Sequence, residues 1–74
     1  MKREMVLRNK LKEARKQKKL SQEELANMVG VARNTITSIE RYEYAPSAYL
    51  AWLLCEALQW KFEDLFYMEF VDKK

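Results

Sequence analysis

The only glycine of this 74-residue chain, Gly30, separates two short segments whose apolar residues recur at helical spacing. Ser21 stands just before the first segment and Glu24 follows three residues later, which is the pattern of a capping box at a helix N-terminus. Gly30 comes directly after this segment, where a left-handed residue commonly ends a helix. The sequence therefore predicts a capped helix, a tight turn at Gly30, and a second helix over residues 32–42.

These two helices have the residues that a helix-turn-helix requires. Ala26 is small enough for a close crossing of the helices, and Gly30 tolerates the positive φ angle of the turn. The expected inward-facing apolar residues are Leu25, Ala26, Val29, Val31, Ile36 and Ile39. In such a unit the first helix crosses the DNA backbone, and the second lies in the major groove with its N-terminal residues at the base edges. The pattern thus predicts a DNA-reading unit within residues 21–41.

The rest of the chain has one proline and no further glycine, which favours helices joined by short turns. Further helices are expected over residues 9–18, 47–58 and 61–66. The residues expected on one face of the first of these are Leu7, Leu11, Ala14 and Arg15. Residues 66–71 have the composition of a strand and are a candidate to pair with residues 5–7. The predicted fold is all-α with five helices, and a small two-stranded pairing of the N- and C-terminal segments is left open.

The length suits a single domain spanning residues 1–74, with a core at 7–66 and a C-terminal extension at 67–74. The helix at 47–58 is apolar over most of its circumference, so it is expected to be buried on two sides, the second of them by another subunit. The candidates for this dimer interface are Leu53, Trp60, Tyr67 and Phe70. The alternative is that these side chains only enlarge the core of a monomer.

Several classes of function lack the residues they need. The chain has no histidine and one cysteine, Cys55, so neither a Cys/His zinc cluster nor an internal disulfide is expected. It has no glycine-rich loop to hold phosphates, which argues against an enzyme and against a small-molecule cofactor. The apolar run at residues 49–55 is too short to span a bilayer, and the charged N-terminus lacks a signal-peptide stretch. We expect a non-enzymatic cytoplasmic protein without a metal or a membrane partner.

Charge is divided unevenly along the chain. Residues 1–42 hold 11 Lys and Arg against 5 Asp and Glu, a net +6, whereas residues 43–74 hold 3 against 6, a net −3. Such a division indicates one surface that meets a polyanion and another that does not. The basic residues expected to contact phosphates from the first helix and its flanks are Arg8, Lys10, Lys18 and Lys19. Double-stranded DNA is the expected partner.

Several separated blocks of sequence agree in order and spacing with a known family. They are SQEELA at 21–26, GV at 30–31, TI at 35–36, IER at 39–41 and PS at 46–47, followed by FEDLF at 62–66. Through these blocks the chain resembles the lambda-repressor/Cro-type helix-turn-helix proteins, also called the XRE family, over roughly residues 7–66. The resemblance implies a five-helix domain whose second and third helices form the reading unit. It also implies a homodimer on a near-palindromic operator.

The resemblance further implies roles for individual residues. Gln22 would reach the DNA backbone and help anchor the reading helix. Arg33 and Asn34 match base-reading positions, and Ser38 matches another one turn later. The other expected contacts to phosphate or to the groove wall are Thr35, Thr37, Arg41 and Tyr44. Side-chain chemistry favours this assignment, because Arg donates two hydrogen bonds to guanine and Asn pairs with adenine.

Two further features of the resemblance concern charge. Arg15 and Glu40 match a structural ion pair beneath the motif. Glu43 stands where family members commonly have a basic phosphate contact, which puts that contact in doubt here.

The function that the sequence predicts is a sequence-specific transcriptional regulator, acting as a homodimeric repressor. The alternative is an antitoxin or accessory protein of the same fold that acts mainly through a protein partner.

Overall fold

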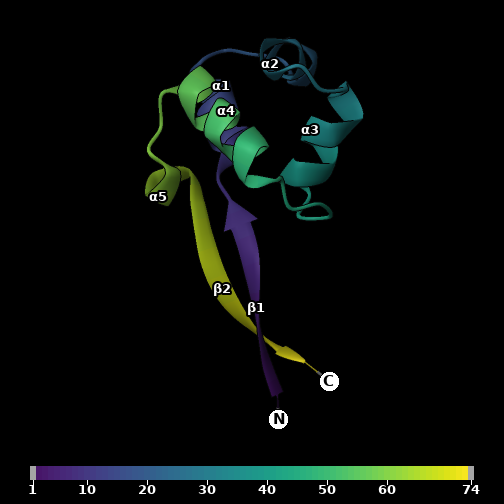
Figure 1. The fold of residues 1–74 in the computed structure, drawn as a ribbon, viewed down its shortest axis with the longest axis vertical. Coiled ribbons are helices and arrows are strands. Elements are labelled where there is room, and N and C mark those ends of the chain that lie inside the picture. The colour runs from purple at the N-terminus through teal and green to yellow at the C-terminus, as the bar shows by residue number, and fades with distance from the viewer. Residues whose placement is uncertain (1, 74) are drawn as a thin grey trace.

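The helices gather at one end of the molecule, and a two-stranded antiparallel sheet projects from them (Figure 1). In chain order the elements are β1 (Lys2–Asn9), α1 (Leu11–Gln17), α2 (Gln22–Val29), α3 (Arg33–Glu40), α4 (Ala48–Leu58), α5 (Phe62–Leu65) and β2 (Phe66–Lys73). This computed structural model describes residues 2–73, with side-chain surroundings for residues 3–72. Residues 1 and 74, the ends of the predicted domain, lie outside the described part.

The five predicted helices are confirmed, and so are the capping box and the turn between α2 and α3. The Ser21 hydroxyl accepts a hydrogen bond from the Glu24 amide at 3.0 Å, and the Glu24 carboxylate accepts one from the Ser21 amide at 2.8 Å. Gly30 ends α2 in the left-handed region, with φ at 76°. α2 has the expected bounds, and the other four helices are one or two residues shorter than expected at one or both ends. At the N-terminal ends of α4 and α5 the reason is that Ser47 and Lys61 are extended N-cap residues.

The description all-α is only roughly right, because both terminal segments form eight-residue strands. The expected pairing of residues 5–7 with residues 66–71 is confirmed, with Met5 opposite Phe70 and Leu7 opposite Met68. The placement of Leu7 on the first helix was wrong, because the chain stays extended up to Asn9. The Asn9 side chain accepts a hydrogen bond from the Leu11 amide and donates one to the Ile39 carbonyl, both at 3.0 Å. These two bonds fix the start of α1.

A single core holds the helices together and includes the base of the sheet. The fully buried large side chains are Leu11, Leu25, Ile36, Ile39, Leu54, Leu58 and Leu65. Most residues expected to face inward from α2 and α3 are buried, and Val31 packs against the core at its edge. Among residues 2–73, none of the helices combines the length and apolarity needed to cross a membrane.

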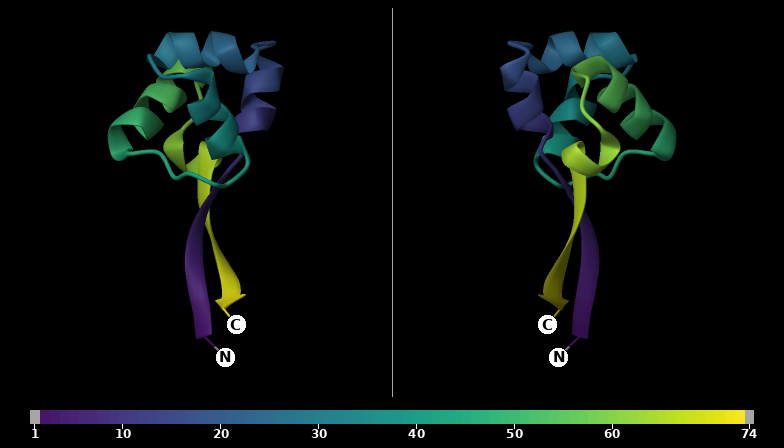
Figure 2. Two further views of the ribbon diagram at one scale, coloured as in Figure 1. Left: turned by 90° about the vertical axis from the view of Figure 1, so that its right-hand side faces the viewer. Right: turned by 90° about the vertical axis from the view of Figure 1, so that its left-hand side faces the viewer.

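The sheet stands clear of the helices over most of its length (Figure 2). Because side chains alternate across a strand, one face of the sheet carries Met5, Leu7, Met68 and Phe70. Met5, Met68 and Phe70 are each at least half exposed. We call these four residues the apolar sheet face. An isolated two-stranded sheet is only marginally stable in water, so this face is a strong candidate for further contacts.

Candidate nucleic-acid interface

The α2–α3 unit directs one side of α3 into the core and the other side outward. Ile36 and Ile39 are fully buried, whereas Arg33 and Asn34 are exposed at the N-terminal end of α3. The amide of Val31 donates a hydrogen bond to the Ala26 carbonyl at 3.0 Å, which tightens the turn after α2. The side of α3 that the sequence predicts to read DNA is therefore open to a partner.

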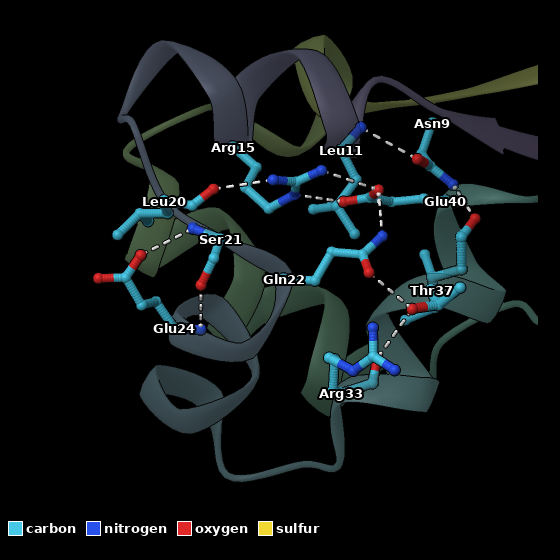
Figure 3. Close-up of polar contacts among 11 residues, drawn as sticks. Asn9, Leu11, Arg15, Leu20, Ser21, Gln22, Glu24, Arg33, Thr37 and Glu40 are labelled. Carbon is cyan, nitrogen blue, oxygen red and sulfur yellow. Dashed lines mark hydrogen bonds and ion pairs between the residues drawn. The ribbon is translucent and has the colours of Figure 1, made fainter.

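A buried ion pair lies beneath this unit (Figure 3). The Arg15 guanidinium on α1 contacts both carboxylate oxygens of Glu40 on α3, at 2.7 and 3.2 Å. Arg15 also donates to the Leu20 carbonyl at 2.8 Å, which ties the α1–α2 connection to the same group. The two side chains are only 9% and 4% exposed. The pair thus joins α1, the following turn and α3 where solvent screens little.

Gln22, the first residue of α2, links this ion pair to the outward side of α3. Its amide nitrogen donates to Glu40 Oε1 at 3.0 Å, and its amide oxygen accepts from the Thr37 hydroxyl at 2.9 Å (Figure 3). The Thr37 hydroxyl is also 3.2 Å from the Arg33 carbonyl. These contacts give Gln22 a role in anchoring α2 to α3. One amide hydrogen of Gln22 is left over for a ligand, because an amide nitrogen carries two.

Two hollows flank the exposed edge of α3. The first, which we call the α1-side hollow, has a volume of about 390 Å³ and is lined by Lys12, Gln22, Arg33, Asn34, Thr37, Glu40 and Arg41. The second, the loop-side hollow, has a volume of about 280 Å³ and is lined by Asn34, Thr35, Ser38, Glu43 and Tyr44. Asn34 lines both hollows and so marks the edge between them. The eight residues that the family resemblance and the loop after α3 assigned to DNA contact each line one hollow or the other.

The basic residues named from the sequence as phosphate contacts are distributed differently. Arg8 is engaged on the sheet, where it contacts Glu69 at 2.8 Å and stacks on the Tyr42 ring. Lys10 borders two hollows, one beside Trp60 and α5 and one that it shares with Lys12 and with Glu40 of α3. Lys18 donates to the Gln59 side chain. Lys19 is exposed in the turn after α1, with φ at 58°.

Lys12 is an exposed basic residue of α1 that lines the α1-side hollow, and the sequence did not single it out as a phosphate contact. The signal that points to it is its spacing from Arg15. Residues three apart share a helix face, and the Arg15 face is the one that meets Glu40 on α3.

The structure does not bring the four predicted dimer residues to one surface. Trp60 lines an apolar groove beside α4, and Phe70 lies on the apolar sheet face. Tyr67 points from the opposite face of the sheet, opposite Arg8 in the strand register. Leu53 is partly buried against the core and does not line the groove. The groove itself was not predicted.

This groove has a volume of about 610 Å³ and is mainly apolar. It is lined by Leu7, Pro46, Ala48, Ala51, Trp52, Cys55, Glu56, Gln59, Trp60, Lys61 and Phe62. Burial raises the pKa of the Cys55 thiol, and the nearby carboxylates of Glu56 and Glu63 raise it further, so the thiol is neutral at pH 7. Cys55 therefore behaves as part of the apolar lining. Leu7 belongs to both the groove and the apolar sheet face, so the two surfaces are continuous.

Comparison with known proteins adds the family. The helix-turn-helix family model HTH_3 matches residues 11–65. The chain is 44% identical over 63 residues to the uncharacterized HTH-type transcriptional regulator YgzD of Bacillus subtilis, covering 85% of this chain and 96% of that protein. It is 43% identical over 63 residues to an uncharacterized HTH-type transcriptional regulator of Methanocaldococcus jannaschii, with the same 85% and 96% coverage.

A solved structure has the same arrangement of helices. The crystal structure of an HTH_3 family transcriptional regulator from Vibrio cholerae superposes with a TM-score of 0.63 at 33% sequence identity. The match covers 70% of this chain but 29% of that protein, so the likeness concerns the helix-turn-helix domain. The protein belongs to the HTH_3 (XRE-type) helix-turn-helix family, whose members are DNA-binding transcriptional regulators and not enzymes.

Proposed function

We propose that the protein is a homodimeric repressor that recognises a near-palindromic DNA operator and reads base edges in the major groove with α3. The observation that carries this proposal is the exposed edge of α3, which lies between two hollows and holds Arg33 and Asn34 at its N-terminal end. A helix in the major groove has a sugar–phosphate backbone on either side. The two hollows are therefore positioned to receive the backbones while the edge meets the bases.

The side chains along this edge have different proposed roles. Arg33 suits a guanine, whose O6 and N7 accept its two parallel donors, and Asn34 suits an adenine. Ser38, one turn later, follows Asn34 on the same side of α3. Thr37 is engaged with Gln22, so its proposed role is to hold the helix rather than to read a base. Tyr44 and Thr35 supply hydroxyls on the loop side.

Replacing Arg33 with alanine should weaken operator binding by about 1–3 kcal/mol and relax the preference at one base pair of each half-site, because a bidentate contact is lost. The change is exposed, so the thermal midpoint should stay near that of the wild type. Arg8→Ala is the matched control, since Arg8 pairs with Glu69 on the sheet, on the face opposite Met5 and Phe70, and lies off the reading edge. Selection of bound sequences from random DNA measures the effect. An unaltered preference in the Arg33 variant would remove Arg33 from the reading residues.

The proposed dimer forms through the groove beside α4 together with the apolar sheet face. Trp52 and Phe62 in the groove, and Met5, Met68 and Phe70 on the sheet, are all at least half exposed. These side chains present roughly 500 Å² of apolar surface, more than half of the ~800 Å² that each partner buries in a standard interface.

A second copy of the chain is the occupant that the charges favour. α4 has a single charged residue, Glu56, and the groove adds one of opposite sign, Lys61. Two such surfaces meet without like-charge repulsion, while the basic residues around α3 stay in solvent for DNA. A dimer also places two copies of α3 on one duplex, which supplies the specificity that one short helix lacks.

Repression follows from occlusion, because a DNA-binding domain on its operator excludes polymerase from that stretch of DNA.

The rival proposal is an antitoxin or accessory role in which another protein fills the groove. That role predicts a groove that stays open in the purified chain. The oligomeric state of the purified protein therefore separates the two.

A further inference from the structure

The outer edge of β1 has no partner strand within residues 2–73, because β2 pairs with its other edge. The Lys10 amide donates to the Leu65 carbonyl at 2.8 Å, which continues the β1–β2 register by one step. In an antiparallel pair, every second residue of a strand exchanges hydrogen bonds with its neighbour. Glu4, Val6 and Arg8 therefore bond to β2, and the odd-numbered residues of β1 direct their backbone groups to the outer edge.

This outer edge is covered at its base and open beyond it. The Tyr42 hydroxyl donates to the outward carbonyl of Asn9 at 3.4 Å. Met5 and Leu7 take part in none of the backbone hydrogen bonds that residues 2–73 make outside the sheet. The sheet also stands clear of the helices there (Figure 2). An open strand edge of this kind is a template for pairing with another strand.

The side chains of β1 favour a second copy of the same strand as the partner. When two β1 strands run antiparallel with their Val6 residues facing each other, Glu4 of each copy lies opposite Arg8 of the other. Both are non-hydrogen-bonded positions, where facing side chains lie closest, and opposite charges there stabilise the pair. Registers centred on Met5 or on Leu7 also keep each face on its own side, but they bring no opposite charges together. The charges thus select one register.

Both charged side chains are available for this contact. Glu4 is exposed, and it takes part in none of the ion pairs among residues 3–72. Arg8 donates its Nε hydrogen to Glu69 at 2.8 Å, which leaves the hydrogens on its two terminal nitrogens. The outer edge of β2 lacks this complementarity. Centring on Glu69 sets its carboxylate against its own copy, and centring on Phe70 brings no opposite charges together.

We infer that the outer edge of β1 binds β1 of a second copy, antiparallel about Val6, and that this contact links one dimer to another. Met5 and Leu7 exchange backbone hydrogen bonds between the copies, and Glu4 and Arg8 form two ion pairs. The contact leaves the groove and the apolar sheet face free for the dimer proposed above, because it uses the backbone edge of the strand. It adds little apolar burial, so it is weaker than the dimer and forms at higher protein concentration. Linking dimers raises the effective concentration of one beside a DNA site that holds the other.

Mixing two charge variants tests this pairing. Glu4→Arg sets arginines against each other at both contacts, and Arg8→Glu sets glutamates against each other. Each variant alone should raise the dissociation constant of the assembly larger than a dimer by about ten-fold or more, because two attractive pairs become repulsive. In an equal mixture every facing pair is again opposite in charge, so the larger assembly should return. Sedimentation velocity over a range of concentrations measures the association, and circular dichroism checks that each variant is folded.

Glu13→Arg is the matched control, since it makes the same charge change at an exposed position of α1, outside the sheet. It should associate as the wild type does. If Arg8→Glu fails to fold beside Glu69, the comparison of Glu4→Arg with Glu13→Arg still decides. A wild-type protein that stays a dimer at every concentration would overturn the inference, as would equal association of these two variants.

Failure of the proposed function would look different. A wild-type chain that is monomeric at low concentration refutes the groove dimer, yet two copies should still pair through β1 at high concentration, and the mixed variants should restore that pairing. A Glu4→Arg variant that is monomeric where the wild type is a dimer would overturn the link between dimers, because the edge would then form the dimer itself.

Discussion

Replacing Glu40 with alanine is expected to lower the free energy of unfolding by about 3–5 kcal/mol, because Arg15 is left buried without its counter-ion. The loss is large beside the roughly 4–11 kcal/mol expected for a domain of this length. The variant also loses the acceptor of the Gln22 amide, so α2 and α3 lose one of their links. Urea unfolding followed by circular dichroism measures the change. A loss below 1 kcal/mol would show that the pair is solvated and not a buried link.

A double variant separates stability from positioning. Arg15→Met combined with Glu40→Leu replaces the ion pair with apolar side chains, an exchange that is often neutral or stabilising. Its unfolding free energy should recover to near the wild-type value. Its affinity for the operator should stay reduced, because Gln22 has lost its acceptor and no longer fixes Thr37 and α3 as before. Full recovery of both properties would show that the network contributes to folding alone.

Replacing Trp52 with glutamate is expected to convert the protein to a monomer and to weaken operator binding by about 100- to 10,000-fold. The reason for dissociation is that a carboxylate would be buried in the apolar groove when two copies meet. The reason for weaker binding is that the second reading helix is no longer held at a high effective concentration. Light scattering and titration of a fluorescent operator measure the two effects.

Tyr49→Glu is the matched control for this variant. Tyr49 is an aromatic residue of the same helix and is 75% exposed, but it does not line the groove. The Tyr49 variant should remain a dimer with near wild-type affinity. If Trp52→Glu also remains a dimer, the groove is not the interface. If the wild-type chain is itself a monomer with an open groove, the accessory role through another protein gains support.

Local sequence patterns were sufficient to predict the helix-turn-helix. The capping box depends on Ser21 and Glu24, which lie within one turn of each other, and the left-handed end of α2 depends on Gly30 itself. Leu7 was misplaced because its spacing to Leu11 suits a helix, while its actual strand depends on pairing with Met68 near the other end of the chain. The hydrogen bond that Asn9 donates at the end of β1 goes to Ile39, 30 residues away, so no local sequence pattern predicts it.

The candidate site was also predictable only in part, because some of its residues depend on how the helices pack. Arg33, Asn34 and Ser38 could be assigned from α3 alone, because one helix determines its own faces. The position of Lys12 beside α3 could not, since it depends on how α1 crosses α3. The dimer surface was harder still. α4 is so uniformly apolar that its sequence does not distinguish Leu53, which packs inward, from Trp52, which is exposed.

The central claim is that two copies of α3 read DNA sequence together, and selection from a random duplex library tests it most directly. The expected result is an inverted repeat whose half-sites are centred about 10–10.5 base pairs, or a multiple of that distance, apart. A pool that stays random after repeated rounds at moderate salt would contradict sequence-specific reading. A single half-site without its inverted copy would contradict the dimer while leaving α3 as the reading helix.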